Sequence, residues 1–110
     1  MVAITKRATL TIANAATVSD AFRSADCVAF GLQMPGTFTG TSISFQVSAD
    51  RGTTFQALYD STGSTLVSVN VAASRSYDLP AELTAFDAFK IVSGSSEGAA
   101  RSLVVIGKAP

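Results

Sequence analysis

Hydrophobic and polar residues alternate with a period of two along most of this chain, as the side chains of a half-buried β-strand do. The clearest example is the segment 41–48, in which Ile43, Phe45 and Val47 alternate with serine and glutamine. Glycine, proline or small polar clusters interrupt the alternation about every 8–12 residues, a spacing typical of sandwiches and barrels. The pattern therefore predicts an all-β fold, either a single antiparallel β-sandwich or a jelly-roll-like barrel of about eight short strands.

The turn signals divide the sequence into successive strands within a single domain spanning 1–110. Three of these strands form a predicted meander, because short loops rich in glycine, serine and threonine join them. Pro80 favours a single helical turn over 80–83. The strands are expected over 8–13, 18–22, 26–34, 41–48, 55–59, 66–71, 85–92 and 102–107, of which 41–48, 55–59 and 66–71 make up the meander.

Both ends of the chain are apolar and are candidates for contact with other subunits. The segment 102–107 is continuously apolar, so it is either buried on both faces or packed against another chain. Residues 1–7 form a candidate N-terminal arm. We predict that these ends make arms or edge strands that meet a neighbouring subunit; the alternative is that they close the sheet of one monomer. The interface candidates are Val2, Ile4, Leu103, Val104, Val105 and Ile106.

The composition narrows the class of protein. Hydrophobic residues make up 47% of the chain and charged residues only 15%, against about 25% in average domains, which excludes an intrinsically disordered chain. Eight basic and eight acidic residues give a net charge of zero, so neither nucleic acid nor an anionic membrane is expected as a partner. No stretch of sequence is long and apolar enough for a transmembrane helix.

Histidine and cysteine usage narrows the chemistry. The chain has no histidine, and Cys27 is its only cysteine, so neither an intrachain disulfide nor a zinc or transition-metal site is expected. Because no histidine can activate Cys27, we interpret it as a small interior thiol. A lone cysteine favours assembly in a reducing cytoplasm. Lys6 and Arg7 follow the apolar start of the chain instead of preceding it, which argues against a signal peptide.

One local motif resembles a known turn. Residues 48–55 are similar to the Asp-box, S-x-D-x-G-x-T-W, of sialidases and other β proteins, with phenylalanine in place of tryptophan. In such a turn the aspartate accepts hydrogen bonds from nearby backbone N–H groups, the glycine supplies a positive φ, and the aromatic ring packs under the hairpin. The box occurs once here, whereas in propellers it repeats in every blade, so we interpret it as a structural turn. Its residues are Ser48, Asp50, Gly52, Thr54 and Phe55.

The acidic residues form no recognisable catalytic or metal-binding pattern. They stand mostly in predicted turns, where aspartate is favoured for hydrogen bonding to the backbone, so we expect no enzyme, no bound metal and no cofactor. The alternatives are a glycosidase carboxylate pair and a calcium ion held by turn carbonyls, but no loop has the dense acidic spacing of a dedicated calcium site. The acids considered are Asp50, Asp60, Asp78, Glu82 and Asp87.

Exposed aromatic rings offer a different binding function. Tyr59, Tyr77 and Phe38 are candidates for solvent-facing rings, which carbohydrate-binding modules use to hold sugars. A carbohydrate-binding or adhesion β-sandwich is therefore an alternative interpretation. Single-stranded nucleic acid would require a basic groove beside the rings, and the basic residues are scattered among equal numbers of acids.

Four segments carry a resemblance to a known group of proteins. They are ISFQVSADRGTTF at 43–55, LYD at 58–60, RSYDLP at 75–80 and FKIVSG at 89–94. Together they resemble small structural proteins of tailed bacteriophages, which are typically β-sandwich or jelly-roll proteins. Within that group, capsid decoration or cement proteins are the most similar in size and character.

The resemblance implies a structural role in the virion. A decoration protein binds the outer shell in many copies and bridges neighbouring capsid subunits, so modest binding energy per copy suffices. The implied partners are the major capsid protein and further copies of this chain, with a trimer matching a threefold site. The implied location is the virion, after assembly in the host cytoplasm. A tail, neck or fibre component of a phage is the alternative within the same group.

Overall fold

The structure, a computed structural model, describes residues 5–109 of the chain. These residues form nine β-strands and one short 3₁₀ helix, so the prediction of an all-β fold is confirmed. The elements are β1 (Thr5–Ile12), β2 (Val18–Arg23), β3 (Ala29–Gln33), β4 (Ser42–Ser48), β5 (Gln56–Ala57), β6 (Ser68–Asn70), β7 (Ser76–Asp78), η1 (Ala81–Ala85), β8 (Ala88–Ser93) and β9 (Arg101–Lys108).

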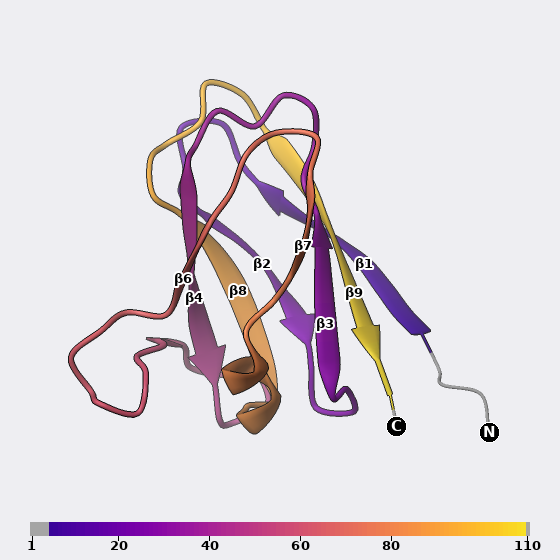
Figure 1. Cartoon of the computed structure of the whole chain (residues 1–110), viewed down its shortest axis with the longest axis vertical. Coiled ribbons are helices and arrows are strands. Elements are labelled where there is room, and N and C mark those ends of the chain that lie inside the picture. Colours follow the sequence, from indigo (N-terminus) through magenta and orange to yellow (C-terminus); the bar gives the residue numbers. More distant parts are fainter. Residues whose placement is uncertain (1–4, 110) are drawn as a thin grey trace.

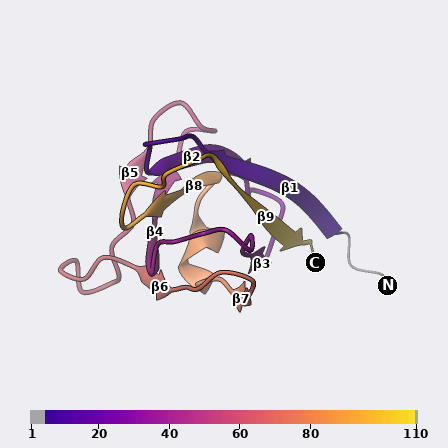
Figure 2. The same cartoon turned by 90° about the horizontal axis from the view of Figure 1, so that it is seen from above.

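The strands form two layers that meet along one corner. They follow the antiparallel path β5-β4-β8-β2-β1-β9-β3-β7, and β6 also pairs with β4. One layer consists of β1, β9, β3 and β7, and the other of β2, β8, β4, β5 and β6 (Figure 1). The path curls round the core as a half-barrel, which the view from above shows (Figure 2).

The core contains a cluster of four phenylalanine rings contributed by both layers. Phe30 of β3 packs edge-on against Phe22 and Phe89, with ring centroids 6.1 and 5.4 Å apart. Phe45 of β4 packs edge-on against Phe89 at 6.1 Å. Edge-to-face packing places the positive rim of one ring against the negative face of the next, which adds to the hydrophobic stabilisation. The alternation read from the sequence thus brings its inward side chains together across the two layers.

The corner between the layers lies in β2. β1 and β2 form one bridge pair, Ile12 with Ser19, after which β2 pairs with β8. The register of β2 against β8 shifts between Val18 and Ala21, as at a β-bulge. The Ser19 hydroxyl accepts the backbone N–H of Ile91 at 2.9 Å, so the bulged segment leaves this buried donor with a partner. The bulge therefore moves the chain from one layer to the other.

The three strands predicted as a meander are arranged differently. β5 and β6 both pair with β4, end to end along the edge that β8 does not occupy. The segment between them leaves the sheet as a hairpin, with a bridge between Tyr59 and Leu66 near its base. The predicted meander was wrong because polar Ser, Thr and Gly residues fill 61–65, and such a segment is more stable in water than over the sheet.

The two chain ends also depart from expectation. β9 pairs with β1 on one side and β3 on the other, so the prediction that 103–106 forms an edge strand was wrong. Residues 5–7, expected in an arm, belong to β1 and pair with β9. The rest of the predicted arm, with Val2 and Ile4, lies outside the described residues.

Candidate functional site

The Asp-box-like turn lies between β4 and β5 and is organised by Asp50. Its carboxylate accepts the Thr54 N–H at 2.9 Å and the Thr54 hydroxyl at 2.6 Å. The Ser48 hydroxyl donates to Asp50 at 2.7 Å and accepts the N–H of Gly52 at 2.8 Å. Gly52 has φ +91°, a conformation that side chains rarely adopt. The residues that resemble the Asp-box thus form one hydrogen-bonded turn.

The charge of Asp50 is held by its own turn. Hydrogen bonds from the Thr54 hydroxyl, the Thr54 N–H and the Ser48 hydroxyl lower the pKa of Asp50 from 3.8 to about 2. Beside the turn, the Lys90 ammonium lies 4.4 Å from the ring centroid of the half-buried Phe55. Every hydrogen bond of the Asp50 carboxylate comes from within four residues, so this cluster is a local turn.

A second carboxylate cluster lies at the opposite end of the sandwich and is buried. Glu97 is 2% exposed. Its carboxylate accepts the backbone N–H groups of Thr39 at 2.9 Å and Gly40 at 3.0 Å, and the Thr39 hydroxyl at 3.0 Å. Arg101 Nε donates to it at 2.9 Å, and the Glu97 carbonyl accepts the Ala15 N–H at 3.0 Å. Glu97 thereby ties three loops together.

The ionised form of Glu97 is favoured despite burial. Burial raises the pKa of this carboxyl, but the hydrogen bonds from Thr39 and Arg101 and the charge of Arg101 outweigh it, so the pKa is lowered. Among residues 5–109 no buried side-chain polar atom lacks a hydrogen-bond partner. The sequence analysis missed Glu97, and the available signal was the Glu97–Arg101 spacing beside a strand rich in apolar residues.

Other acids expected in turns are engaged with the backbone. Asp60 accepts the Thr62 N–H at 3.0 Å, and hydrogen bonding from the Thr62 hydroxyl is the main cause of its lowered pKa. Asp87 accepts the Arg51 N–H at 3.1 Å. Within the described range 5–109, no group of three or more acidic or cysteine side chains is placed to hold a metal ion, and no pocket is present. No helix in this range is long and apolar enough to span a bilayer.

Cys27 lies inside the sandwich, next to β9. It is 5% exposed, and burial is the main cause of its raised pKa. A Cβ atom on Gly107 would come within 2.6 Å of its sulfur and 3.2 Å of the Phe22 ring, so β9 needs a glycine there. The thiol therefore fills the space beside a glycine of β9.

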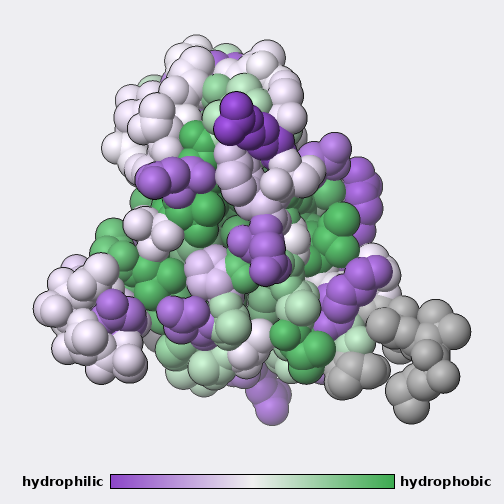
Figure 3. Space-filling model, in the orientation of Figure 1, coloured by the Kyte–Doolittle hydropathy of each residue, from purple (hydrophilic) through white to green (hydrophobic). Residues whose placement is uncertain are grey.

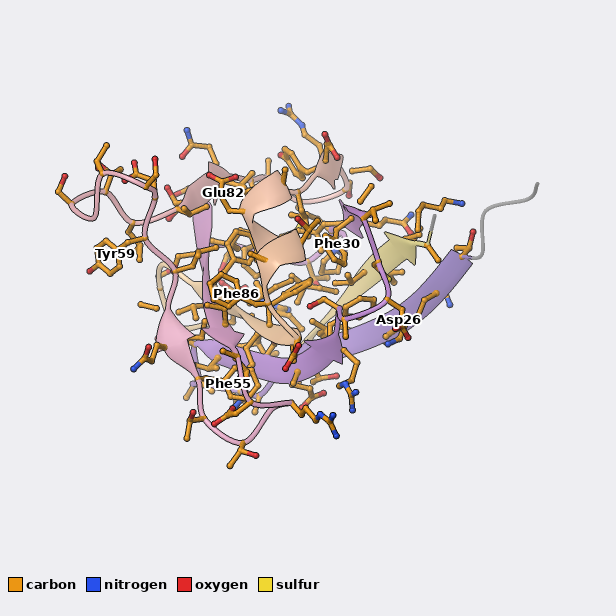
Figure 4. All side chains as sticks on the ribbon, turned by 90° about the horizontal axis from the view of Figure 1, so that it is seen from below. Asp26, Phe30, Phe55, Tyr59, Glu82 and Phe86 are labelled. Carbon is orange, nitrogen blue, oxygen red and sulfur yellow. The ribbon has the colours of Figure 1, made fainter. Side chains whose placement is uncertain are left out.

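The three candidate aromatic rings have different environments. Tyr59 is 50% exposed on the projecting hairpin and lies clear of the sandwich, whereas Phe30 and Phe86 lie beneath η1 (Figure 4). Tyr77 is half-buried and its hydroxyl accepts the Ala72 N–H at 2.8 Å. Phe38 is 4% exposed, so its expected exposure was wrong, because it packs in the core. These three rings do not form a common platform.

The described interface candidates alternate between two environments. Leu103 and Val105 are 0% exposed and belong to the core, so they are not available to a neighbouring subunit, and this part of the interface prediction is corrected. Val104 and Ile106 point to the other face and are half-buried. The physical reason is that a strand between two others in a two-layer fold turns alternate side chains inward.

The fold is similar to solved structures. It matches the SPBc2 prophage-derived protein YomS at 17% identity, over 99% of this chain and 98% of that chain, with a TM-score of 0.58. PirA matches at 15% identity over 93% and 92%, with a TM-score of 0.49. A Bacillus endospore appendage protein, from a family of disulfide-linked pili, matches at 13% over 98% and 89%, with a TM-score of 0.44. The sequence matches no protein family and no curated protein.

Proposed function

We propose that this protein is a structural subunit of a bacteriophage virion, of the capsid decoration or cement type. The observation that carries the proposal is the likeness to a prophage-derived protein, YomS, which extends over 99% of this chain and 98% of that chain. The resemblance of 40–108 to small virion proteins of tailed phages points in the same direction. The proposed partner is the major capsid protein, and the proposed location is the virion.

The roles of the acidic side chains support a structural protein. Asp50 and Asp60 hydrogen-bond within their own turns, Asp87 holds a neighbouring turn, and Glu97 holds three loops. A general acid or a nucleophile must instead meet substrate with its carboxylate. The proposed function accordingly includes no catalytic step and no cofactor.

The surface seen in Figure 3 fits repeated contacts with protein neighbours. Hydrophobic and hydrophilic residues are interspersed over that face, and the lobe at lower left is mostly of intermediate hydropathy. The net charge of zero avoids repulsion between copies that sit close together on a shell. Self-association of the subunit is part of the proposal.

Sedimentation of the purified protein with capsids that lack it tests the proposal. We expect saturable co-sedimentation at a copy number set by shell symmetry, and greater resistance of the decorated shells to heat. The matched control is an unrelated sandwich protein of the same size at the same concentration. Absence of binding to shells, together with binding to purified tails, would replace decoration by the tail, neck or fibre role.

A glycan array on the same preparation tests the carbohydrate-binding alternative. Tyr59 is the only one of the three candidate rings that is strongly exposed, and a single ring offers a small stacking surface. We therefore expect no glycan binding that depends on Tyr59. Binding lost in Tyr59→Ala, with the fold intact, would favour the carbohydrate-binding module instead.

A further inference from the structure

The outer edge of β1 carries backbone groups that no described strand pairs with. β1 pairs with β9 along its full length, from Thr5–Lys108 to Ile12–Arg101. On its other side, its one bridge to β2 is the pair of Ile12 with Ser19. Figure 1 shows β1 and β2 close at the top and diverging toward the bottom. The edge from Thr5 to Thr11 is therefore open.

The direction of the open backbone groups follows from Thr11. Its N–H donates to the Asp20 carboxylate at 3.2 Å, on the β2 side, so it points away from β9. Backbone groups of a strand alternate in direction, so the N–H and C=O of Thr5, Arg7 and Thr9 also point to the open edge. Their side chains are exposed on the outer face of the layer.

Lysine and arginine at a sheet edge normally discourage pairing with another chain. Lys6, however, is turned back into its own subunit. Its ammonium donates to the carbonyl of Arg23 and lies 5.0 Å from the ring centroid of Phe22. It therefore does not extend across the open edge. Arg7 is left as the one basic side chain of β1 on the outer face.

The charges along the edge are complementary to themselves under a twofold rotation. Arg7 lies toward the amino end of the edge, and the Asp20 carboxylate lies at the carboxyl end, where it holds the Thr11 N–H. Antiparallel pairing with a second copy brings the basic end of each edge next to the acidic end of the other. Parallel pairing would bring the basic ends together, which is unfavourable.

We propose that the open edge of β1 pairs with the same edge of a second copy of this chain, antiparallel and about a twofold axis at Ala8. This register places Thr5 opposite Thr11 and Arg7 opposite Thr9 of the second copy. It joins the β1 layers of two subunits into one continuous sheet, an isologous contact. The symmetry is twofold, in contrast to the trimer that the phage resemblance implies.

The inference rests on the proposed function in one respect, since a repeating structural subunit contacts copies of itself, but it is tested on the purified chain. Sedimentation velocity over a concentration series is expected to show a monomer–dimer equilibrium. A chain that stays monomeric at its highest soluble concentration, or that forms trimers without dimers, overturns the proposal.

Two substitutions at Thr9 test whether backbone pairing at this edge holds the dimer. Thr9→Pro removes an N–H that points to the open edge while leaving the pairing with β9 intact, and we expect loss of the dimer. Thr9→Val has nearly the same shape and keeps the N–H, so the dimer is expected to remain. Circular dichroism of both monomers checks the fold. A dimer that survives Thr9→Pro in a folded protein overturns the proposal.

Cysteine cross-linking tests the register. At a twofold axis through Ala8 the two Ala8 Cα atoms form a non-hydrogen-bonded pair about 4.5 Å apart, within disulfide range. The two Thr9 Cα atoms are then diagonal neighbours more than about 7 Å apart. Ala8→Cys is therefore expected to form a covalent dimer on mild oxidation, and the more exposed Thr9→Cys is not. Equal or reversed cross-linking would indicate random collision and overturn the register.

A charge exchange and the shell assay complete the test. Arg7→Glu is expected to weaken the dimer at least tenfold, and the double variant Arg7→Glu/Asp20→Lys to restore it; failure of the restoration contradicts the twofold charge pairing. Thr9→Pro is then mixed with undecorated capsids. A dimer without shell binding leaves the inference standing and removes the proposed function, whereas shell binding by a strictly monomeric wild type does the reverse.

Discussion

The two hydrogen-bonded carboxylates at opposite ends of the sandwich are built from similar donors but in opposite ways. Asp50 is exposed and takes its hydrogen bonds from Ser48 and Thr54, within four residues along the chain. Glu97 is 2% exposed and accepts from Thr39, 58 residues away in sequence. One cluster shapes a turn, and the other fixes loops that have no other connection.

The comparison indicates that burial, more than the number of hydrogen bonds, sets the importance of a carboxylate. If Asp50 is removed, water replaces its hydrogen bonds to Thr54. If Glu97 is removed, two backbone N–H groups and the Arg101 guanidinium lose their acceptor where water has little access. The same chemical group is therefore expected to matter far more at position 97.

The largest expected effect comes from Glu97→Ala. Removal of one partner of a buried, hydrogen-bonded charge pair costs about 3–5 kcal/mol. The typical stability of a domain is about 5–15 kcal/mol, so this variant is expected to lose a large part of it. Urea-induced unfolding followed by circular dichroism measures the difference. A loss below about 1 kcal/mol would contradict the role assigned to Glu97.

A double variant separates the ion pair from the backbone contacts. Replacing a buried ion pair by apolar residues is often neutral. Glu97→Met/Arg101→Met is nevertheless expected to remain destabilised, because the N–H groups of Thr39 and Gly40 still lose their acceptor. Full recovery of stability would show that only the uncompensated charge mattered.

A smaller effect is expected in the Asp50 turn, from Gly52→Ala. The φ of +91° disfavours any side chain, which costs about 1–2 kcal/mol. The nearest heavy atom to an added Cβ would be Phe55 Cζ at 3.9 Å, so crowding adds nothing. The matched control is Gly98→Ala, where the Cβ meets no atom within 4 Å and φ is not positive. Equal unfolding midpoints for the two variants would remove the conformational argument.

The smallest effect is a pH dependence that belongs to Asp50. Its pKa is lowered from 3.8 to about 2 on folding, so the unfolded chain binds more protons between these values. The stabilisation is therefore complete above 3.8 and is lost as the pH falls toward 2. Asp50→Asn is expected to flatten stability over this range, measured by urea unfolding in acid. Asp78→Asn removes the same charge from an exposed site and serves as control.

The sequence predicted the strands better than it predicted their neighbours. Alternation placed Phe45 inward in β4, and Pro80 marked the start of η1. It did not predict that β9 lies between β1 and β3, or that β5 and β6 share one edge of β4. Alternation fixes which side chains share a face, but pairing depends on which distant strands find a common core.

The sequence by itself determined the all-β class and the residues of the Asp50 turn. Both follow from interactions over a few residues, the period of two and the hydrogen bonds of a turn. Only the tertiary structure decided that Glu97 is buried, that Leu103 and Val105 face the core, and that the edge of β1 stays open. These properties depend on the bulge at Ser19, which sends β2 to the other layer, and on loops brought together from opposite ends of the chain.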